Sequence, residues 1–150
     1  MLDLLKGAKI TQIGYLVHDA AAAVAKYEAL LGQKLNHQNV TDPYEQSQCT
    51  YNGRRCDGRA ICAFFNLAGG MAIELIEPDE APSVWRDDLN SRGEGIHHIA
   101  FHIKGMAEMT KKCEEAGFRL LQKGEYTGGR YAYFDADSVL GARLELLEND

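Results

Sequence analysis

The sequence predicts an α+β fold in which two βαβββ modules pack as a single domain over residues 1–150. The first observation is an internal repeat. Residues 70–79, GMAIELIEPD, align with residues 141–150, GARLELLEND, at an offset of 71, and five of the ten positions are identical. The second is that both halves pass from an alternating strand pattern into a helical pattern and back to strands. Because neither half can bury a sheet face alone, we expect one continuous, curved, mixed sheet.

The first module is predicted over residues 8–79. Residues 10–17 alternate and are rich in β-forming side chains, which predicts a strand. Asp19 is placed to cap a helix with one apolar face, and Gly32 lies just past the end of that helix. The polar stretch 41–58 contains two hairpin-type dipeptides, Asn52-Gly53 and Asp57-Gly58. The other extended segments are expected at residues 34–40, 49–51, 59–66 and 71–77.

Residues 80–94 are predicted to link the modules, with Ser83 capping a short helix that carries the lone tryptophan, Trp85. The second module is predicted over residues 95–150. Its first strand pattern, HHIAFHI at residues 97–103, aligns with TQIGYLV at residues 11–17 at an offset of 86. A helix ending at Gly117 follows. The remaining strands are expected at residues 118–122, 130–135 and 142–148.

Composition narrows the class of partner. A net charge of −6 and a pI of about 5.3 argue against nucleic acid or an anionic membrane surface as the main partner. No apolar run approaches the roughly 20 residues that a spanning helix needs. The N-terminus lacks the pattern of a secretory signal, so we expect a cytoplasmic protein. The four cysteines form no CxxC pair and are expected to be reduced and mostly buried.

Four residues at matching positions of the repeat predict a metal site: Gln12, Glu74, His98 and Glu145. Glu74 and Glu145 each stand inside an apolar strand, where a buried carboxylate is costly unless a partner neutralises it. An arginine is one such partner, and Arg143 is close in sequence. Two carboxylates with an amide and an imidazole at the matching positions also suit a divalent ion such as Zn, Co, Mn or Ni.

Neighbouring polar residues have plainer interpretations. Strand alternation turns His97 away from His98 and predicts a packed histidine. His102 shares the face of His98, so it is a candidate substrate-binding or orienting side chain, although a core histidine is equally consistent. Tyr131 is a second candidate for substrate binding, and sheet packing is its alternative. Glu77 and Glu148 lie on the opposite face and are expected to be solvated strand ends.

With these residues placed, the chain resembles the vicinal oxygen chelate superfamily, which includes glyoxalase I, methylmalonyl-CoA epimerase, extradiol dioxygenases and bleomycin-resistance proteins. The resemblance covers nearly the whole chain and rests on ITQIGYLVHD, the ELIEP strand end, GEGIHHIAFHI, GGRYAYFD and LELLE. The segments IHHIAF and PSVWRDDLNSRGEG are most similar to the methylmalonyl-CoA epimerase-like branch. The resemblance implies paired modules that enclose a cleft.

The resemblance also implies a chemistry. The metal positions of the family fall on Gln12, Glu74, His98 and Glu145, a set similar to that of some glyoxalase I enzymes. It implies a divalent-metal-dependent epimerase or isomerase that removes the proton α to a carbonyl held by the ion, with Glu145 as the base. The substrate would be a small carbonyl compound, of which an acyl-CoA thioester is one type. The subunit pairing common in this family, together with the exposed linker that carries Trp85, favours a homodimer. The tryptophan itself is expected to pack against one half or against a partner subunit.

Two family features are missing from the sequence. Residues 42–58 do not match the hairpin motif that carries a second acid/base glutamate in epimerases, and GYLV follows Gln12 where glyoxalase I has an arginine. These two absences leave the substrate class open between the two types of enzyme. A non-catalytic protein that uses the same cleft to bind an antibiotic-like ligand is the alternative function. An iron-dependent extradiol dioxygenase requires a histidine in place of Gln12, which argues against that class.

Overall fold

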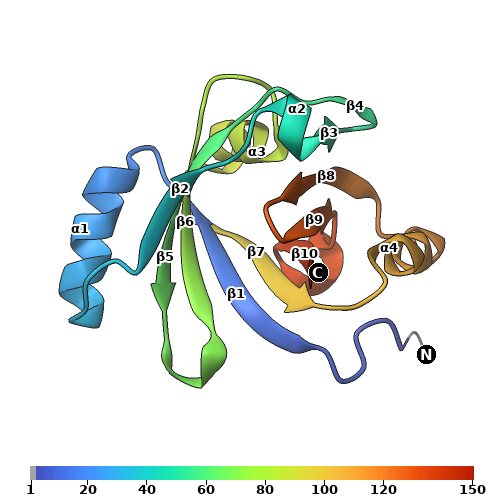
Figure 1. Ribbon diagram of the computed structural model, residues 1–150, viewed down its shortest axis with the longest axis horizontal. Helices are drawn as coiled ribbons and strands as arrows, with labels where there is room; N and C mark the ends of the chain where they lie inside the picture. The colour runs from blue at the N-terminus through green and yellow to red at the C-terminus, as the bar shows by residue number, and fades with distance from the viewer. Residues whose placement is uncertain (1–2) are drawn as a thin grey trace.

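The computed structural model describes residues 3–150, and in them a single curled ten-stranded sheet carries its two longest helices on its outer side (Figure 1). The strands run in the order β2-β5-β6-β1-β7-β10-β9-β8-β3-β4. Their bounds are β1 Lys9–Leu16, β2 His37–Val40, β3 Thr50–Tyr51, β4 Arg54–Arg55, β5 Ala60–Asn66, β6 Ala72–Pro78, β7 Gly95–His102, β8 Leu120–Tyr126, β9 Gly129–Phe134 and β10 Arg143–Asn149. The helices are α1 Ala20–Leu31, α2 Tyr44–Ser47, α3 Val84–Arg92, α4 Met106–Glu115, α5 Asp137–Leu140 and a 3-10 turn at Ala68–Gly70. The predicted α+β fold with a curved mixed sheet is confirmed.

The repeat is visible in the pairing of the four central strands. β1 pairs with β6 in parallel and β7 pairs with β10 in parallel, while the antiparallel pair β1–β7 joins the two halves. Gln12 lies opposite Ala72 in the first half, and His98 lies opposite Arg143 in the second. These two pairs correspond at the same offsets of 86 and 71 that align the sequences, so the sequence repeat is also a structural one.

Capping residues that were evident in the sequence mark the ends of α1 and the start of α3. The Asp19 side chain accepts a hydrogen bond from the backbone N–H of Ala22, and Gly32 closes α1 with a left-handed φ of 65°. Ser83 accepts from the backbone N–H of Arg86 at the start of α3. These caps confirm both predicted ends of α1 and the predicted start of α3.

The segment between β2 and β5 was only partly predicted. Asn52 and Gly53 both have positive φ, 50° and 74°, and form the tight turn of the β3–β4 hairpin as expected. The second expected hairpin turn, Asp57-Gly58, is wrong, because β4 does not pair with β5 and the chain continues through these residues into β5. β3 instead pairs with β8, so the hairpin of the first half joins the edge of the second (Figure 1). The short helices α2 and α5 were not predicted.

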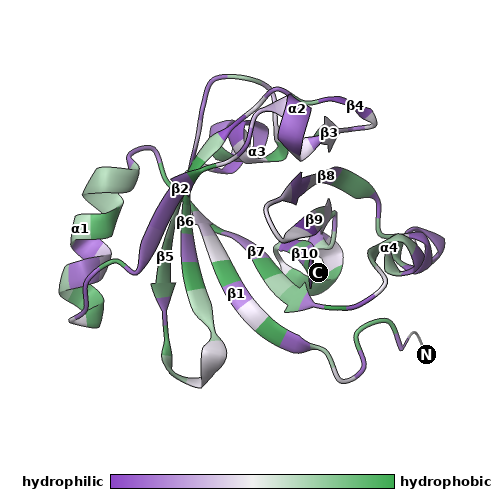
Figure 2. Cartoon of the chain, in the orientation of Figure 1, coloured by the Kyte–Doolittle hydropathy of each residue, from purple (hydrophilic) through white to green (hydrophobic). Residues whose placement is uncertain are grey.

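Three hydrophobic clusters hold the layers together. α1 packs against β1, β5 and β6 on the outside of the first half, and α4 does the same for β7, β9 and β10 in the second. The third cluster lies on the concave side, where α3 brings Val84, Trp85 and Leu89 against both halves. β2 at the sheet edge is exposed throughout, and its residues are hydrophilic except for the last, Val40 (Figure 2). The concave side of the four central strands is therefore the side on which a site shared by both halves can form.

Glu77 and Glu148 have equivalent structural roles in the two halves. Both side chains leave the sheet on its outer side, as alternation predicts, but they do not end in solvent. Glu77 accepts a hydrogen bond of 2.7 Å from the backbone N–H of Ala20 at the start of α1. Glu148 accepts from the backbone N–H groups of Gly105 and Met106 at 2.7 and 3.1 Å, at the start of α4. The expectation of solvated strand ends was wrong, since each glutamate anchors the helix of its own module by satisfying N–H groups that the helix leaves free.

Among residues 3–150, no helix has the length and apolar character that crossing a membrane requires.

Candidate metal centre

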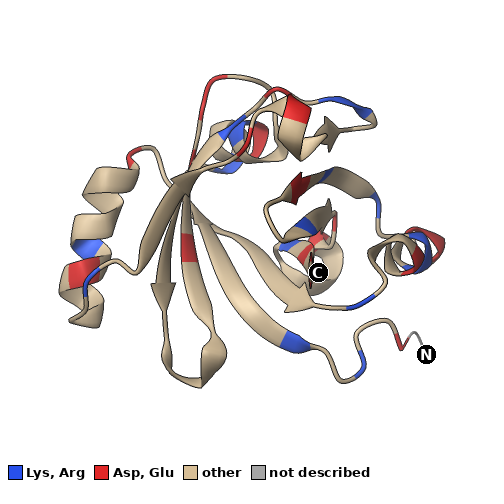
Figure 3. Ribbon diagram, in the orientation of Figure 1, with Lys and Arg blue, Asp and Glu red and all other residues tan. Residues whose placement is uncertain are grey.

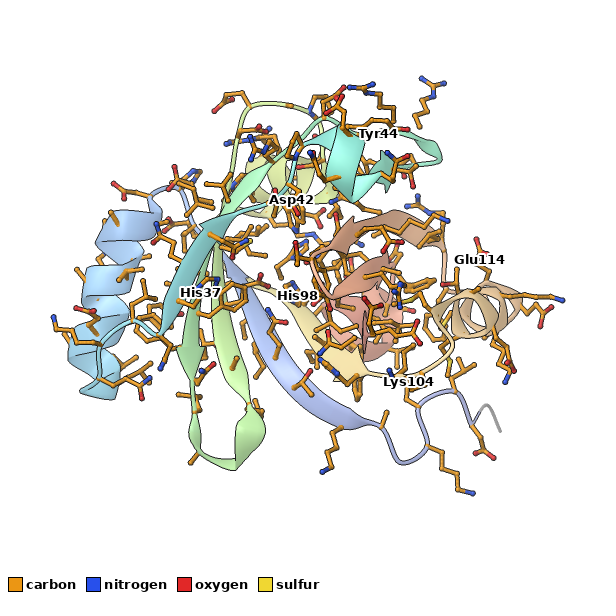
Figure 4. All side chains as sticks on the ribbon, in the orientation of Figure 1. His37, Asp42, Tyr44, His98, Lys104 and Glu114 are labelled. Carbon is orange, nitrogen blue, oxygen red and sulfur yellow. The ribbon has the colours of Figure 1, made fainter. Side chains whose placement is uncertain are left out.

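Each of the four central strands contributes one of the four predicted ligands to the concave face. Glu74 comes from β6, Gln12 from β1, His98 from β7 and Glu145 from β10, and these strands are consecutive neighbours in the sheet. Figure 4 places His98 near the middle of the molecule, between the two halves, and His37 on β2 at the edge of the sheet. Residues 24 to 133 positions apart in the sequence are thus brought together by the pairing of these four strands.

The imidazole of His98 stands between the two carboxylates. Its Nε2 lies 3.1 Å from Oε2 of Glu145 and 3.3 Å from Oε2 of Glu74. One ligand atom from each of these three residues lies within 4.8 Å of the others. His98 is fully buried, and Glu145, Glu74 and Gln12 are exposed by only 3%, 7% and 8%. Glu74, His98 and Glu145 therefore form a possible divalent-metal site, and Gln12 lines the same cleft.

Buried atoms of the three residues are left without conventional partners. Within residues 3–150, Nε2 of His98 and the Oε2 atoms of both glutamates have no neighbour in hydrogen-bond geometry, despite the short distances between them. Such atoms are costly to bury unless something else satisfies them. An ion with two positive charges at their meeting point would balance the two carboxylates and accept the imidazole lone pair. Oxygen and nitrogen donors of this kind fit Zn, Co, Mn or Ni.

Electrostatics point the same way. Burial raises the pKa of the Glu74 carboxyl even though His98 opposes the shift. Burial lowers the pKa of His98, but the carboxylates of Glu145 and Glu74 outweigh it and raise that pKa to about 10. The cluster therefore attracts positive charge, which a proton or a divalent cation can supply. In Figure 3 charged residues gather on α3, α4 and the β3–β4 hairpin, whereas β7, the strand that carries His98, has none.

Gly14 makes the space that the ring of His98 occupies. The two residues lie opposite each other in the β1–β7 pair. A Cβ at Gly14 would stand 1.9 Å from Cε1 of His98 and 2.4 Å from both ring nitrogens, which no real contact allows. At the equivalent position of the repeat, Gln12 lies opposite Ala100, which carries a methyl group. The glycine therefore stands opposite the histidine, and the alanine stands opposite the glutamine. The sequence signal that could have identified Gly14 as part of the site was its alignment with Ala100 in the repeat.

His97 does not point away from His98, so that expectation was wrong. The register of β1–β7 shifts between Gly14 and Tyr15, because Gly14 pairs with His98 and Tyr15 pairs with Ile96. His97 is the extra residue of this bulge, and a bulge breaks strict alternation. It is buried, as predicted for a packed histidine, but its Nδ1 lies 3.1 Å from Nδ1 of His98.

Behind His97 lies a buried ion pair. Nε2 of His97 is 2.9 Å from Oδ2 of Asp88, and Arg143 donates to both Asp88 oxygens at 2.9 and 2.8 Å. Burial raises the pKa of Asp88, but its bonds to Arg143 and His97 hold that pKa well below the ordinary range. Burial lowers the pKa of His97 to about 4. The sequence had left open that Arg143 neutralises one of the buried glutamates. Arg143 instead bonds Asp88 of α3, so it does not neutralise Glu74 or Glu145.

A cleft of about 550 Å³ opens from the carboxylates toward an aromatic wall. Trp85 donates its ring N–H to the hydroxyl of Tyr133 at 3.2 Å, and Tyr131 packs against both rings. The Tyr131 hydroxyl accepts from the side-chain amide of Gln122 at 3.2 Å and lies 3.5 Å from Sγ of Cys49. This wall shields one side of the site from water.

The comparisons with known proteins decide the family. A family model described as the glyoxalase/bleomycin resistance protein/dioxygenase superfamily matches residues 11–134. The chain belongs to this superfamily. Across 143 residues it is 27% identical to YqjC of Bacillus subtilis (strain 168), an uncharacterised protein, and the match covers 93% of this chain and 91% of that one.

Two solved structures have the same fold. The hypothetical protein BH1468 from Bacillus halodurans has a TM-score of 0.67 at 25% identity, with 97% of this chain and 96% of that chain covered. A variant of methylmalonyl-CoA epimerase from Streptomyces coelicolor, in complex with 2-nitronate-propionyl-CoA, has a TM-score of 0.64 at 25% identity, with 94% and 96% covered. The glyoxalase-like fold of this chain thus has methylmalonyl-CoA epimerases among its structural neighbours.

The structure brings most of the predicted site residues of this superfamily member to the cleft and leaves others outside it. Gln12, Glu74, Glu145 and Tyr131 line the cleft, and His98 lies directly beneath it. Within the described residues, His102 is not part of the cleft lining. Trp85 is 3% exposed and packs in the aromatic wall of its own chain, which is one of the two packing arrangements expected for it, so this tryptophan lends no support to the predicted homodimer. Asp88 was missed because nothing local distinguishes it from the other charged residues of the linker.

Proposed function

We propose that this chain is a divalent-metal-dependent epimerase or isomerase that removes the proton α to a carbonyl group of a small substrate. The observation that carries the proposal is the convergence of Glu74, His98 and Glu145, whose facing atoms are buried, within 4.8 Å of one another and without hydrogen-bond partners. Gln12 completes a ligand set with one side chain from each central strand.

Gln12, Glu74, His98 and Glu145 would hold the ion, which is Zn, Co, Mn or Ni. When bound, the ion would supply Lewis-acid stabilisation of the charge that develops on the substrate carbonyl oxygen. Burial of all four residues keeps water away and strengthens that stabilisation.

Glu145 would act as the base. Its carboxylate lines the cleft, and its backbone pairs with Tyr133 of the aromatic wall. A substrate lying between Glu145 and this wall would present its α-carbon to a carboxylate within reach of a proton. Return of the proton to the other face of the same carbon gives epimerisation, and return to the neighbouring carbon gives isomerisation.

The structural neighbour that holds 2-nitronate-propionyl-CoA supports an acyl-CoA thioester as one substrate class. A 2-oxo compound is the other class, because the ligand set is similar to that of some glyoxalase I enzymes. A cytoplasmic location and a homodimer are further parts of the proposal, and light scattering after gel filtration tests the second.

The test is a proton-exchange screen in deuterated buffer. Purified protein loaded with Zn or Co is mixed with acyl-CoA thioesters and 2-oxo compounds, and deuterium entering the α-carbon is followed by NMR. We expect exchange in one of the two classes, loss of exchange after chelation, and recovery when the metal is restored.

Two outcomes would contradict the proposal. Exchange that survives complete removal of metal would show that the ion is not needed. Tight binding of a substrate-like or antibiotic-like ligand without exchange, unchanged by chelation, would favour the non-catalytic binding protein.

A further inference from the structure

Behind the candidate ligand His98 runs a buried chain of polar groups that the proposed chemistry does not itself use. Nδ1 of His98 lies 3.1 Å from Nδ1 of His97, and Nε2 of His97 lies 2.9 Å from Oδ2 of Asp88. Arg143 then donates two hydrogen bonds to Asp88, at 2.9 and 2.8 Å. The chain ends at Arg143, which also lies 3.1 Å from Oδ1 of Asp135.

The proton positions along this chain follow from Asp88. An ionised carboxylate only accepts hydrogen bonds, so the nitrogen facing it, Nε2 of His97, must carry a proton. Arg143 already balances the charge of Asp88, so His97 needs no positive charge of its own. A neutral His97 with its proton on Nε2 has a lone pair on Nδ1. That lone pair faces His98, and Nδ1 of His98 must therefore be the donor.

The consequence for His98 is a fixed orientation. With Nδ1 donating to His97, the neutral ring offers a lone pair on Nε2. This is the atom that lies 3.1 Å from Glu145 and 3.3 Å from Glu74. The opposite tautomer would place a lone pair of His97 against the carboxylate of Asp88 and a lone pair of His98 in the wrong direction.

The chain serves only one of the two modules. At the repeat positions of His97 and Arg143 the first module has Thr11 and Ala72, which cannot form the same bonds. Asp88 comes from α3, between the modules, so this helix does more than connect them. Only the second module has this chain, and only the second module supplies a histidine ligand. The first module supplies Gln12, whose amide has no tautomer to select.

We propose that His97, Asp88 and Arg143 are positioning residues that hold His98 as the Nδ1-protonated tautomer and so direct its Nε2 lone pair at the cation. This inference rests on the proposed function, since its benefit is metal affinity. Partners of this kind, bonded to the free nitrogen of a ligating histidine, change metal affinity by about 10- to 100-fold when they are removed.

The first experiment measures zinc affinity by competition with a chromophoric chelator. We expect His97→Phe, which fills the space without an acceptor, and Asp88→Asn to bind zinc about 10- to 100-fold more weakly than the unmodified protein. His97→Gln, whose amide both accepts from His98 and donates to Asp88, should restore much of the affinity. Thr11→Val is the matched control beside the ligand of the other module and should bind zinc normally. Equal affinity in His97→Phe and the unmodified protein would overturn the inference.

The second experiment uses metal-free protein with ¹⁵N-labelled histidines. A scalar coupling between Nδ1 of His97 and Nδ1 of His98, with the shared proton on His98, is expected and should vanish in His97→Phe. A proton on Nδ1 of His97, or no coupling, would overturn the inference whatever the metal does. Failure of the unmodified protein to bind zinc would instead overturn the proposed function, so the two failures are distinguishable.

Discussion

Glu145→Gln is expected to lower deuterium exchange at the substrate α-carbon by about 10²- to 10⁴-fold, the usual contribution of a positioned general base. The substitution keeps the size of the side chain and one oxygen that can face the cation, but the amide cannot take a proton. Exchange is measured by NMR on protein whose metal content has been matched to that of the unmodified chain, so that loss of metal does not imitate loss of the base.

Glu148→Gln is the matched control for this prediction. It makes the same chemical change three residues further along β10, on the outer side of the sheet, where the carboxylate accepts from the backbone N–H groups at the start of α4. It should leave exchange nearly unchanged while it weakens the anchoring of that helix. Full exchange in Glu145→Gln would remove Glu145 from the role of base.

Gly14→Ala is expected to disrupt the site although it adds only a methyl group. The new Cβ would stand 1.9 Å from Cε1 of His98, whose ring is held from behind by His97. Overpacking of this kind costs about 1–3 kcal/mol, and displacement of the ring should abolish zinc binding in a titration. The equivalent change in the other module, Ala100→Gly, removes a methyl group and should retain zinc binding at a cost of about 0.5–1 kcal/mol.

A double-mutant cycle assigns the cost of Gly14→Ala to His98. Urea unfolding of the metal-free protein gives the cost of Gly14→Ala with His98 present and in a His98→Ala background. The cost should largely disappear once the ring is gone. The same cost in both backgrounds would mean that the methyl group clashes with something else, and that Gly14 does not make room for the imidazole.

Features set by local chemistry and by the repeat were predictable. Asp19 and Ser83 cap helices through bonds to residues three positions away, so their signals are complete within a short window. Strand alternation placed Gln12, Glu74 and Glu145 on one face without knowledge of the pairing. The repeat then showed that these residues occupy matching positions in the two halves. The pairing of β1 with β7 brings the two halves together.

Features that depend on pairing between distant segments were not predictable. A single extra residue in β7 turned His97 toward His98, and a bulge depends on the partner strand as much as on its own sequence. Asp88 and Arg143 meet across 55 positions, and no local pattern selects that arginine over its alternatives. The β3–β4 hairpin pairs with β8 of the other half, although its turn, Asn52-Gly53, was evident.

The most direct measurement is an anomalous-diffraction map from crystals grown with Co²⁺. The proposed function predicts one dominant peak between the modules, with bonds of about 2.0–2.2 Å to the carboxylates of Glu74 and Glu145 and to Nε2 of His98, and with the amide oxygen of Gln12 as the fourth protein ligand. A peak elsewhere on the chain, or crystals in which His98 stays paired with the glutamates at saturating Co²⁺ and no peak lies between them, would contradict it.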